Sequence, residues 1–101
     1  MGDVAEQRWP ELPDGLELTR TTAAFTSETV PKGLLRGHQV APGVWGNIVV
    51  REGSLGFAFE DDLETVRSLT VDDTQAIPPQ LPHRVILTGP VTFVVEFYRA
   101  D

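Results

Sequence analysis

Residues 31–53, PKGLLRGHQVAPGVWGNIVVREG, decide the fold class that the sequence predicts. They contain His38, the turn sequence Ala41-Pro42-Gly43, and an apolar run from Trp45 to Val50. Adjacent proline and glycine mark a tight turn. An apolar run rich in β-branched residues and bounded by turns is typical of a strand buried on both faces. The stretch therefore predicts a histidine beside a turn, followed by a buried strand in the wall of a sandwich or barrel.

The second of the two histidines, His83, ends a proline-rich segment, IPPQLPHR at residues 77–84. This segment predicts a turn that leads into a strand at 83–87. Histidines on two separate strands can meet across a small barrel, and neutral imidazole is a favoured ligand of zinc, iron, copper and nickel. Spacing alone leaves two interpretations open, a pair of metal ligands or two ordinary hydrogen-bonded histidines.

Short apolar segments separated by turn sequences recur along the whole chain and predict about eight strands with no long helix. Besides the run at 45–51, the predicted strands lie at 16–26, which a break near Arg20 divides in two, and at 55–59, 65–71, 75–77, 83–87 and 91–99. Glu52-Gly53-Ser54 predicts a hairpin turn, and Leu34-Leu35 predicts a single helical turn. The pattern is that of an all-β sandwich or barrel.

The composition describes one globular domain, because 101 residues with 41% hydrophobic residues suffice for a single core. We divide the chain into an N-terminal arm at 1–15 and a single domain at 16–101. We expect Trp9 of the arm to pack on the barrel exterior or to cover a partner subunit. The chain has no cysteine, no apolar leader and no long apolar run, which predicts a cytoplasmic protein without disulfides.

Acidic residues outnumber basic residues by 15 to 8, which gives a net charge of −7. Binding of nucleic acid needs a cationic footprint that releases counterions, and the lysines and arginines of this chain are scattered. We therefore expect no nucleic-acid partner and no membrane partner. The acidic segment 60–64 lacks the spaced oxygen ligands and the glycine of a calcium loop, so we interpret it as a solvated turn.

The sequence identifies no catalytic residues, and these stay unknown. None of Ser27, Ser54 and Ser68 has the spacing of a nucleophile elbow. The glycines of 43–46 are not followed by a predicted helix, so they form no phosphate-binding loop. Whether the protein is an enzyme is uncertain at this point.

Five motifs, in this order, resemble one known family. They are FTSETVP at 25–31 with LL at 34–35 and His38, GVWG at 43–46, EGSL at 52–55, IPP at 77–79 with Pro82 and His83, and FVVEFYR at 93–99. They resemble the cupin-like domain that occurs alone in YeaR-type proteins and forms the N-terminal part of some TehB tellurite-resistance proteins. The resemblance implies a double-stranded β-helix, that is, a cupin-like jelly-roll barrel. It also implies an association with tellurite, nitrate or nitrite stress, but no settled reaction.

The residues and the resemblance together predict one divalent metal ion, zinc, iron or nickel, held by His38, His83 and Glu96. Glu96 is the only acid inside the strongly apolar segment 91–99, where an unpaired carboxylate is costly to bury. Strand parity also allows Glu96 to face solvent. Cupins customarily use four ligands, and this chain lacks two of them. Three protein ligands would leave coordination positions open for a small molecule or an oxyanion at the barrel mouth.

Two functional interpretations and one assembly state follow from these patterns. The protein is a metal-binding cupin-like protein, enzymatic or sensing, or it is a non-enzymatic binding or assembly module without metal. We also expect a homodimer, because segment 91–99 carries large apolar residues on both faces and a lone small barrel has only one interior. Exposed apolar patches of this kind mark interfaces. An N-terminal arm that covers the patch is the monomeric alternative.

Overall fold

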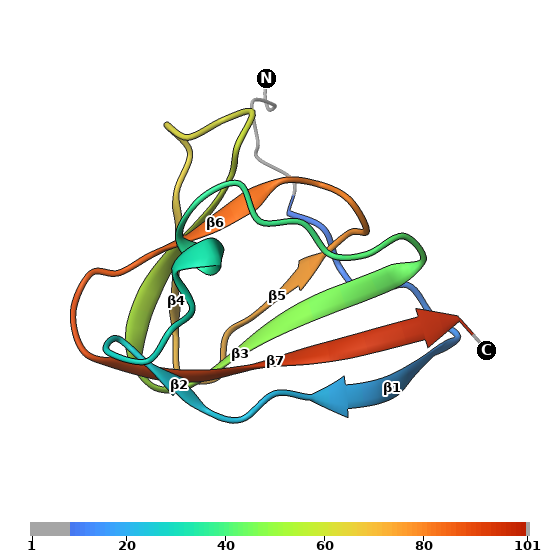
Figure 1. Ribbon diagram of the computed structural model, residues 1–101, viewed down its shortest axis with the longest axis horizontal. Coiled ribbons are helices and arrows are strands. Elements are labelled where there is room, and N and C mark those ends of the chain that lie inside the picture. Colours follow the sequence, from blue (N-terminus) through green and yellow to red (C-terminus); the bar gives the residue numbers. More distant parts are fainter. Residues whose placement is uncertain (1–8, 101) are drawn as a thin grey trace, which may run out of the picture.

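The computed structural model describes residues 9–100 and consists of seven β-strands and one short 3-10 helix (Figure 1). The elements are β1 (Leu16–Thr21), β2 (Phe25–Thr26), η1 (Lys32–Leu35), β3 (Val44–Phe59), β4 (Arg67–Thr70), β5 (Thr74–Ile77), β6 (His83–Ile86) and β7 (Val91–Ala100). All strand pairs are antiparallel. The all-β prediction is confirmed, and the predicted helical turn is the end of η1.

The 16-residue strand β3 connects the whole domain, because it pairs with four other strands. Its first part pairs with β5 and β7, and β7 in turn pairs with β1 and β2. We call these five strands the large sheet. The last part of β3 pairs with β4 and β6, which we call the small sheet. In Figure 1, β3 passes from the large sheet beside β7 to the small sheet beside β4.

Gly53 marks the point where β3 leaves the large sheet, and the predicted hairpin turn at Glu52-Gly53-Ser54 is wrong. The strand continues through these residues, with a register shift against β7 between Val50 and Glu52. Gly53 has a φ of 74°, and a Cβ atom there would lie 2.1 Å from the Pro90 carbonyl oxygen. A residue without Cβ is therefore required for an irregular strand that passes this close to a neighbouring backbone.

The hydrophobic core lies between the two sheets. Its large-sheet side includes Ile48, Val50, Val91, Phe93 and Val95, and its small-sheet side includes Leu55, Phe57, Phe59, Leu69 and Val85. Complete burial of one such side chain contributes about 1.5–3 kcal/mol. Successive side chains of a strand point to opposite faces. Since Val95 and Phe97 both belong to the core side of β7, the residue between them, Glu96, faces the other way.

Trp9 lies against this core, which corrects the expectation that it packs on the barrel exterior. Its indole ring stacks on Phe59, with ring centroids 5.9 Å apart, and meets the edge of Phe57 at 6.3 Å. The Pro10 carbonyl accepts a hydrogen bond of 3.4 Å from the side chain of Gln75. Trp9 and Pro10 of the predicted arm are thus anchored to the domain, and residues 1–8 lie outside the described residues.

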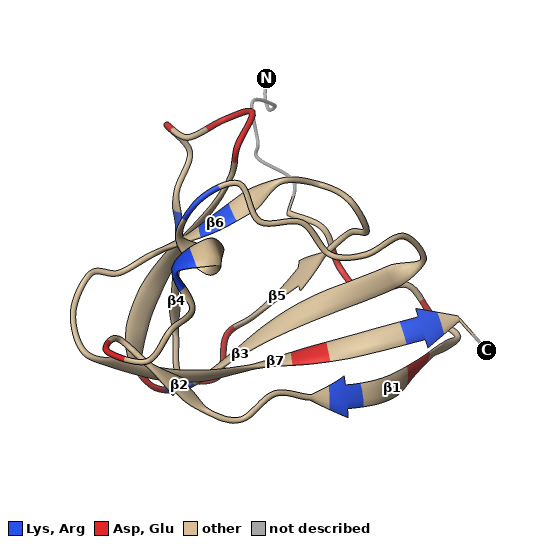
Figure 2. Ribbon diagram, viewed as in Figure 1, with Lys and Arg blue, Asp and Glu red and all other residues tan. Residues whose placement is uncertain are grey.

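Charged residues lie mainly on loops and strand ends (Figure 2). The basic positions in residues 9–100 are spread over η1 and the loop after it and over β1, β3, β4, β6 and β7, so they do not gather on one element. The acidic positions include the loop between β3 and β4, which the sequence interpretation placed in a turn. Within the described range, no helix has both the length and the apolar character needed to cross a membrane.

Candidate functional site

The structure brings His38 and His83 together as partners in an isolated antiparallel bridge. The backbone nitrogen of each donates a hydrogen bond of 2.9 Å to the carbonyl oxygen of the other. Their imidazole rings lie edge to face, with centroids 5.3 Å apart. Two residues far apart in sequence therefore present both imidazoles at one place.

Local turns position the two histidines. His83 is the first residue of β6 and follows the proline-rich loop, in which Gln80 adopts a left-handed backbone with φ of 62°. His38 lies between η1 and the turn at 41–43, where Val44 donates a hydrogen bond of 3.1 Å to Ala41. The sequence correctly predicted both turns.

The two imidazoles line an otherwise apolar cavity of about 180 Å³ between the sheets. Apolar side chains of both sheets and of the η1 region form most of its wall, namely Phe25, Pro31, Leu34, Val40, Ile48, Ile77, Val85, Val95 and Phe97. Thr22 is a further polar residue of the wall, and its hydroxyl oxygen accepts a 3.0 Å hydrogen bond from the Val95 backbone nitrogen. The histidines therefore supply most of the polar character of this cavity.

His83 is held as a neutral imidazole with a defined tautomer. Its side chain is buried, with 1% exposure, and stacks on Phe57 at a centroid distance of 5.6 Å. Nδ1 lies 3.0 Å from the Leu81 carbonyl oxygen, which can only accept, so Nδ1 carries the proton and the lone pair is on Nε2. Burial lowers the pKa of His83, although the hydrogen bond to Leu81 opposes this shift. His83 thus offers a lone pair at neutral pH.

His38 carries a buried nitrogen without a partner. Its Nδ1 is shielded from solvent and has no hydrogen-bond partner within residues 9–100. Burial also lowers the pKa of His38, so this ring is neutral at pH 7. Buried polar atoms are hydrogen-bonded in the large majority of cases, and this exception belongs to a residue of the cavity wall.

Glu96, the predicted third metal ligand, does not lie with the histidines. Its carboxylate accepts hydrogen bonds from the Asn47 side-chain nitrogen at 3.1 Å and from the Tyr98 hydroxyl at 2.8 Å, on the outer face of the large sheet. Burial and the bond to Glu96 raise the pKa of Tyr98. In the described part of the chain no three histidine, cysteine or acidic side chains form a group that could hold a metal ion.

Sequence reasoning missed Glu60, which joins the neighbours of both histidines. Its carboxylate accepts hydrogen bonds from the Gly37 backbone nitrogen at 2.5 Å and from Arg84 at 2.8 and 2.9 Å. Hydrogen bonds from Arg84 and Gly37 lower the pKa of Glu60. The predicted turn is present and residues 61–64 are exposed, but the side chain of its first residue also bonds protein groups. The sequence carries no signal for this contact, because three segments far apart in sequence form it.

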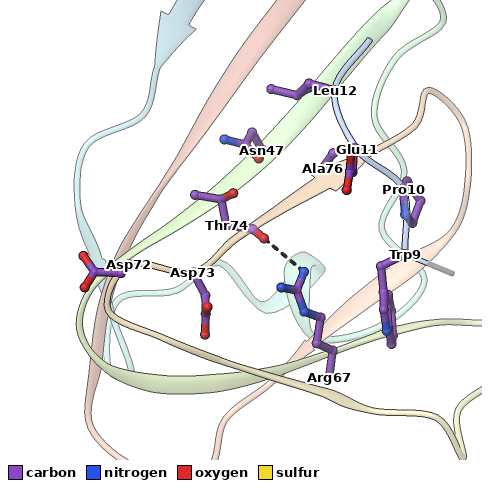
Figure 3. Close-up of a pocket in the computed structure, with 10 residues that line it drawn as sticks. All are labelled: Trp9, Pro10, Glu11, Leu12, Asn47, Arg67, Asp72, Asp73, Thr74 and Ala76. Atoms are coloured by element: carbon purple, nitrogen blue, oxygen red, sulfur yellow. Dashed lines mark hydrogen bonds between the residues drawn. The ribbon is translucent and has the colours of Figure 1, made fainter. Parts of the chain in front are cut away.

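A second, larger recess of about 920 Å³ lies beside the N-terminal segment and is polar (Figure 3). Trp9, Arg67 and Asp73 belong to its wall. Figure 3 shows the Arg67 guanidinium directed at the Thr74 carbonyl, to which it donates at 3.1 Å, and it also donates to Gln75 at 2.6 Å. Asp73 accepts hydrogen bonds from Thr70. These polar groups are already hydrogen-bonded within the domain, so this recess is a weaker candidate for a ligand site than the cavity beside the histidines.

Comparison with solved structures shows which proteins share this fold. A crystal structure of a protein from E. coli strain K12 has a TM-score of 0.80 at 22% identity, covering 91% of this chain and 98% of that protein. TehB from Haemophilus influenzae has a TM-score of 0.77 at 24% identity, covering 86% of this chain but only 32% of TehB. A cupin-2 domain containing protein from Shewanella frigidimarina has a TM-score of 0.50 at 15% identity, with coverages of 88% and 76%.

Sequence comparison gives the family. The search against curated proteins gave no match. The family model of the TehB-like domain matches residues 20–95, which is more than half of the chain. The matched range contains both histidines, Glu60 and Arg84, and extends from β1 into β7. The chain belongs to the TehB-like domain family.

Proposed function

We propose that this TehB-like domain binds a small molecule in the cavity beside His38 and His83. The observation that carries the proposal is the buried Nδ1 of His38, a residue of this mainly apolar wall, because no group within residues 9–100 forms a hydrogen bond with it. A buried polar atom without a hydrogen bond costs about 1–3 kcal/mol. A ligand that donates to this atom, or coordinates it, recovers that cost. The apolar wall supplies the remaining contact area.

The first form of this proposal is a divalent ion, zinc, iron or nickel, held by the two imidazoles. Both rings are neutral because burial lowers the pKa of each, and neutral imidazole is the form that binds metal. The hydrogen bond from His83 Nδ1 to the Leu81 carbonyl is the kind of outer contact that orients metal-bound histidines. A bound ion would polarise an oxygen atom of a small molecule or an oxyanion.

The ligand set of this metal site is smaller than the sequence predicted. Glu96 bonds Asn47 and Tyr98 instead of joining the histidines. Catalytic zinc sites use three protein ligands, so a two-histidine site would bind its ion more weakly. It would also leave more positions for an exogenous ligand, which suits binding or sensing as well as a reaction.

The second form needs no metal and is favoured by the apolar wall. An anion in such a cavity would lose its hydration without gaining a charged partner, so the metal-free cavity suits an uncharged molecule that donates a hydrogen bond to imidazole. A cavity of about 150 Å³ lined by apolar side chains binds benzene, and the cavity here is of similar size. A single-ring molecule with one hydroxyl group matches this description.

The cellular role that we propose is an association with tellurite, nitrate or nitrite stress. TehB from Haemophilus influenzae shares the fold, and the motifs described above resemble tellurite-resistance proteins. This chain covers 32% of that protein, so the activity of the remaining TehB sequence is not transferred. We further propose the closed double-stranded β-helix of cupins, supported by the likeness to a cupin-2 domain containing protein and by a β3 shared between two sheets.

Metal analysis tests both forms of the proposal. Wild type, His38→Ala and His83→Ala are purified without added metal, and zinc, iron and nickel per chain are measured before and after addition of each ion. We expect uptake by wild type and not by either histidine variant, with Glu96→Gln as the matched control that retains uptake. If wild type takes up no ion, binding of phenol is measured by NMR. Absence of both kinds of binding overturns the proposal.

We also propose that the domain forms a homodimer through the outer face of the large sheet. Trp45 and Tyr98 are half-buried cross-strand partners on this face, and Leu18, which pairs with Tyr98 from the edge strand β1, is 52% exposed. Large apolar side chains on the outer face favour a second copy as a cover. Light scattering at micromolar concentration should give twice the chain mass, and Leu18→Lys should shift the mass toward the monomer. A monomer mass for wild type contradicts the proposal.

A further inference from the structure

Glu60 contacts both sides of the histidine bridge. Its backbone nitrogen donates a 3.0 Å hydrogen bond to the Pro82 carbonyl, directly before His83. Its carboxylate binds Arg84, directly after His83, through two hydrogen bonds. The same carboxylate accepts a hydrogen bond from the backbone nitrogen of Gly37, directly before His38. One side chain thus fixes the chain segments that carry the two imidazoles.

The histidine bridge needs such a contact because it stands alone. A regular ladder would continue on both sides of the pair, but His38 and His83 form an isolated bridge. On one side, Gln80 donates a hydrogen bond of 2.9 Å to the Val40 carbonyl. On the other side lies Gly37, which has a φ of 58° and no side chain to hold it in place. On that side the Glu60 carboxylate accepts the hydrogen bond of the Gly37 backbone nitrogen and so connects this segment to β6 through Arg84.

The ion pair between Glu60 and Arg84 is partly exposed, so we expect it to position the histidine segments and to add little to the stability of the fold. The Arg84 and Glu60 side chains are 31% and 23% exposed, and surface ion pairs contribute little to folding stability. Loss of Glu60 should therefore leave the fold intact. Loss of the bond to Gly37 frees the segment that carries His38, so the effect should be seen in the relative placement of the two rings.

We propose that Glu60 is a positioning residue of the candidate site, because its carboxylate holds the His38 segment against the His83 segment and so fixes the separation of the imidazoles. The importance of this separation for binding rests on the function proposed above. The positioning itself does not, because the ring separation can be measured without a ligand. Outer contacts that orient a binding histidine typically contribute about 10–100-fold to affinity.

The test uses the whole chain and three variants. Glu60→Ala removes both contacts, Glu60→Gln keeps an oxygen acceptor for Gly37 but loses the charge, and Asp61→Ala is a control in the same turn at an exposed position. Folding is verified by circular dichroism. The first readout is the NMR cross-relaxation between ring protons of His38 and His83, and the second is zinc affinity by calorimetry.

We expect Glu60→Ala to weaken the contact between the rings and to lower zinc affinity about tenfold, with Glu60→Gln between it and wild type. Asp61→Ala should match wild type in both measurements. If wild type binds no zinc but Glu60→Ala still loses the ring contact, the positioning role stands and the metal function fails. A ring contact of wild-type intensity in Glu60→Ala, or its loss in Asp61→Ala as well, overturns the inference.

Discussion

Two of the recesses of this domain, the one beside Trp9 and the cavity beside the histidines, differ in size and in how their polar atoms are bonded. The recess beside Trp9 has a volume of about 920 Å³, and its Arg67 donates hydrogen bonds to Thr74 and Gln75 (Figure 3). The cavity beside the histidines has a volume of about 180 Å³ and is lined by His38, whose Nδ1 has no hydrogen-bond partner in the described part of the chain. The polar groups of the larger recess form hydrogen bonds that stabilise the fold. In the smaller one, a histidine nitrogen has no hydrogen bond within residues 9–100.

This contrast teaches that volume alone is a poor guide to function in a small β domain. Arg67 is the first residue of β4, and its guanidinium donates a hydrogen bond to Gln75 of β5, a polar side chain with 0% exposure. A buried amide without a partner would be costly, so the arginine has a structural task. The Nδ1 atom of His38 has no comparable hydrogen bond within residues 9–100, and backbone atoms form the histidine bridge. Substitutions in the two recesses should therefore have opposite consequences.

The largest effect is expected for His83→Phe, which should abolish binding while the fold remains. Phenylalanine keeps an aromatic ring that can stack on Phe57, but it has no Nε2 lone pair. Loss of a binding group should exceed the 10–100-fold loss typical of outer contacts, so we expect at least about a 100-fold loss of zinc affinity. Calorimetry measures the affinity, and urea unfolding verifies the fold. Retained affinity would remove His83 from the site.

Parts of this architecture could be predicted from the sequence because local signals determine them. An apolar segment that follows a turn predicted β7, and turn sequences placed His38 beside a turn and His83 at the start of a strand. Strand parity also allowed the outward position of Glu96, since Val95 and Phe97 on either side of it face the core. Glu96 was nevertheless predicted as a metal ligand, because an unpaired carboxylate is costly to bury in an apolar segment. The alternation of side chains along the strand instead places Glu96 on the outer face.

Other parts depend on contacts between distant segments and had no local signal. A glycine between two apolar runs fits a hairpin as well as an irregular strand, and the approach of Pro90 to Gly53 decides between them. The acidic segment 60–64 contains several carboxylates, and nothing in the sequence distinguishes one of them from the others. Only the fold shows that Glu60 turns back toward Gly37 and Arg84. Composition and periodicity do not show which groups far apart in sequence form a hydrogen bond in the folded chain.

The converse substitution in the larger recess, Arg67→Met, should lower stability and leave binding unchanged. Methionine keeps the aliphatic part of the side chain but removes the donor to Gln75. The buried amide oxygen then lacks a partner, at a cost of about 1–3 kcal/mol. Urea unfolding measures the loss, with Asp72→Asn as a control on the wall of the same recess. Reduced zinc affinity in Arg67→Met would show that the two recesses are coupled and would weaken the contrast.

The smallest effect is expected from mild acid, and its sign follows from the lowered pKa values of both histidines. Burial sets the folded-state pKa of His38 and of His83 below the ordinary value of 6.5. In the range just below pH 6.5 the unfolded chain therefore binds more protons than the folded chain, and stability falls as the pH falls. Binding should weaken in the same range, because protons compete for the imidazole lone pairs.

Acidic groups titrate in a separate range, which allows the histidine effect to be isolated. The pKa values of Glu60 and Asp73 lie below their ordinary values of 4.5 and 3.8, because both carboxylates accept hydrogen bonds. Their contribution to stability is lost only at lower pH. Unfolding in urea at pH 7.5 and at about pH 5.5 should therefore show a modest loss for wild type. In the double variant His38→Phe/His83→Phe that loss should shrink, because the groups that titrate in this range are gone. An equal loss in both proteins would mean that the cavity does not hold its histidines in the neutral form, and the contrast with the recess beside Trp9 would lose its electrostatic basis.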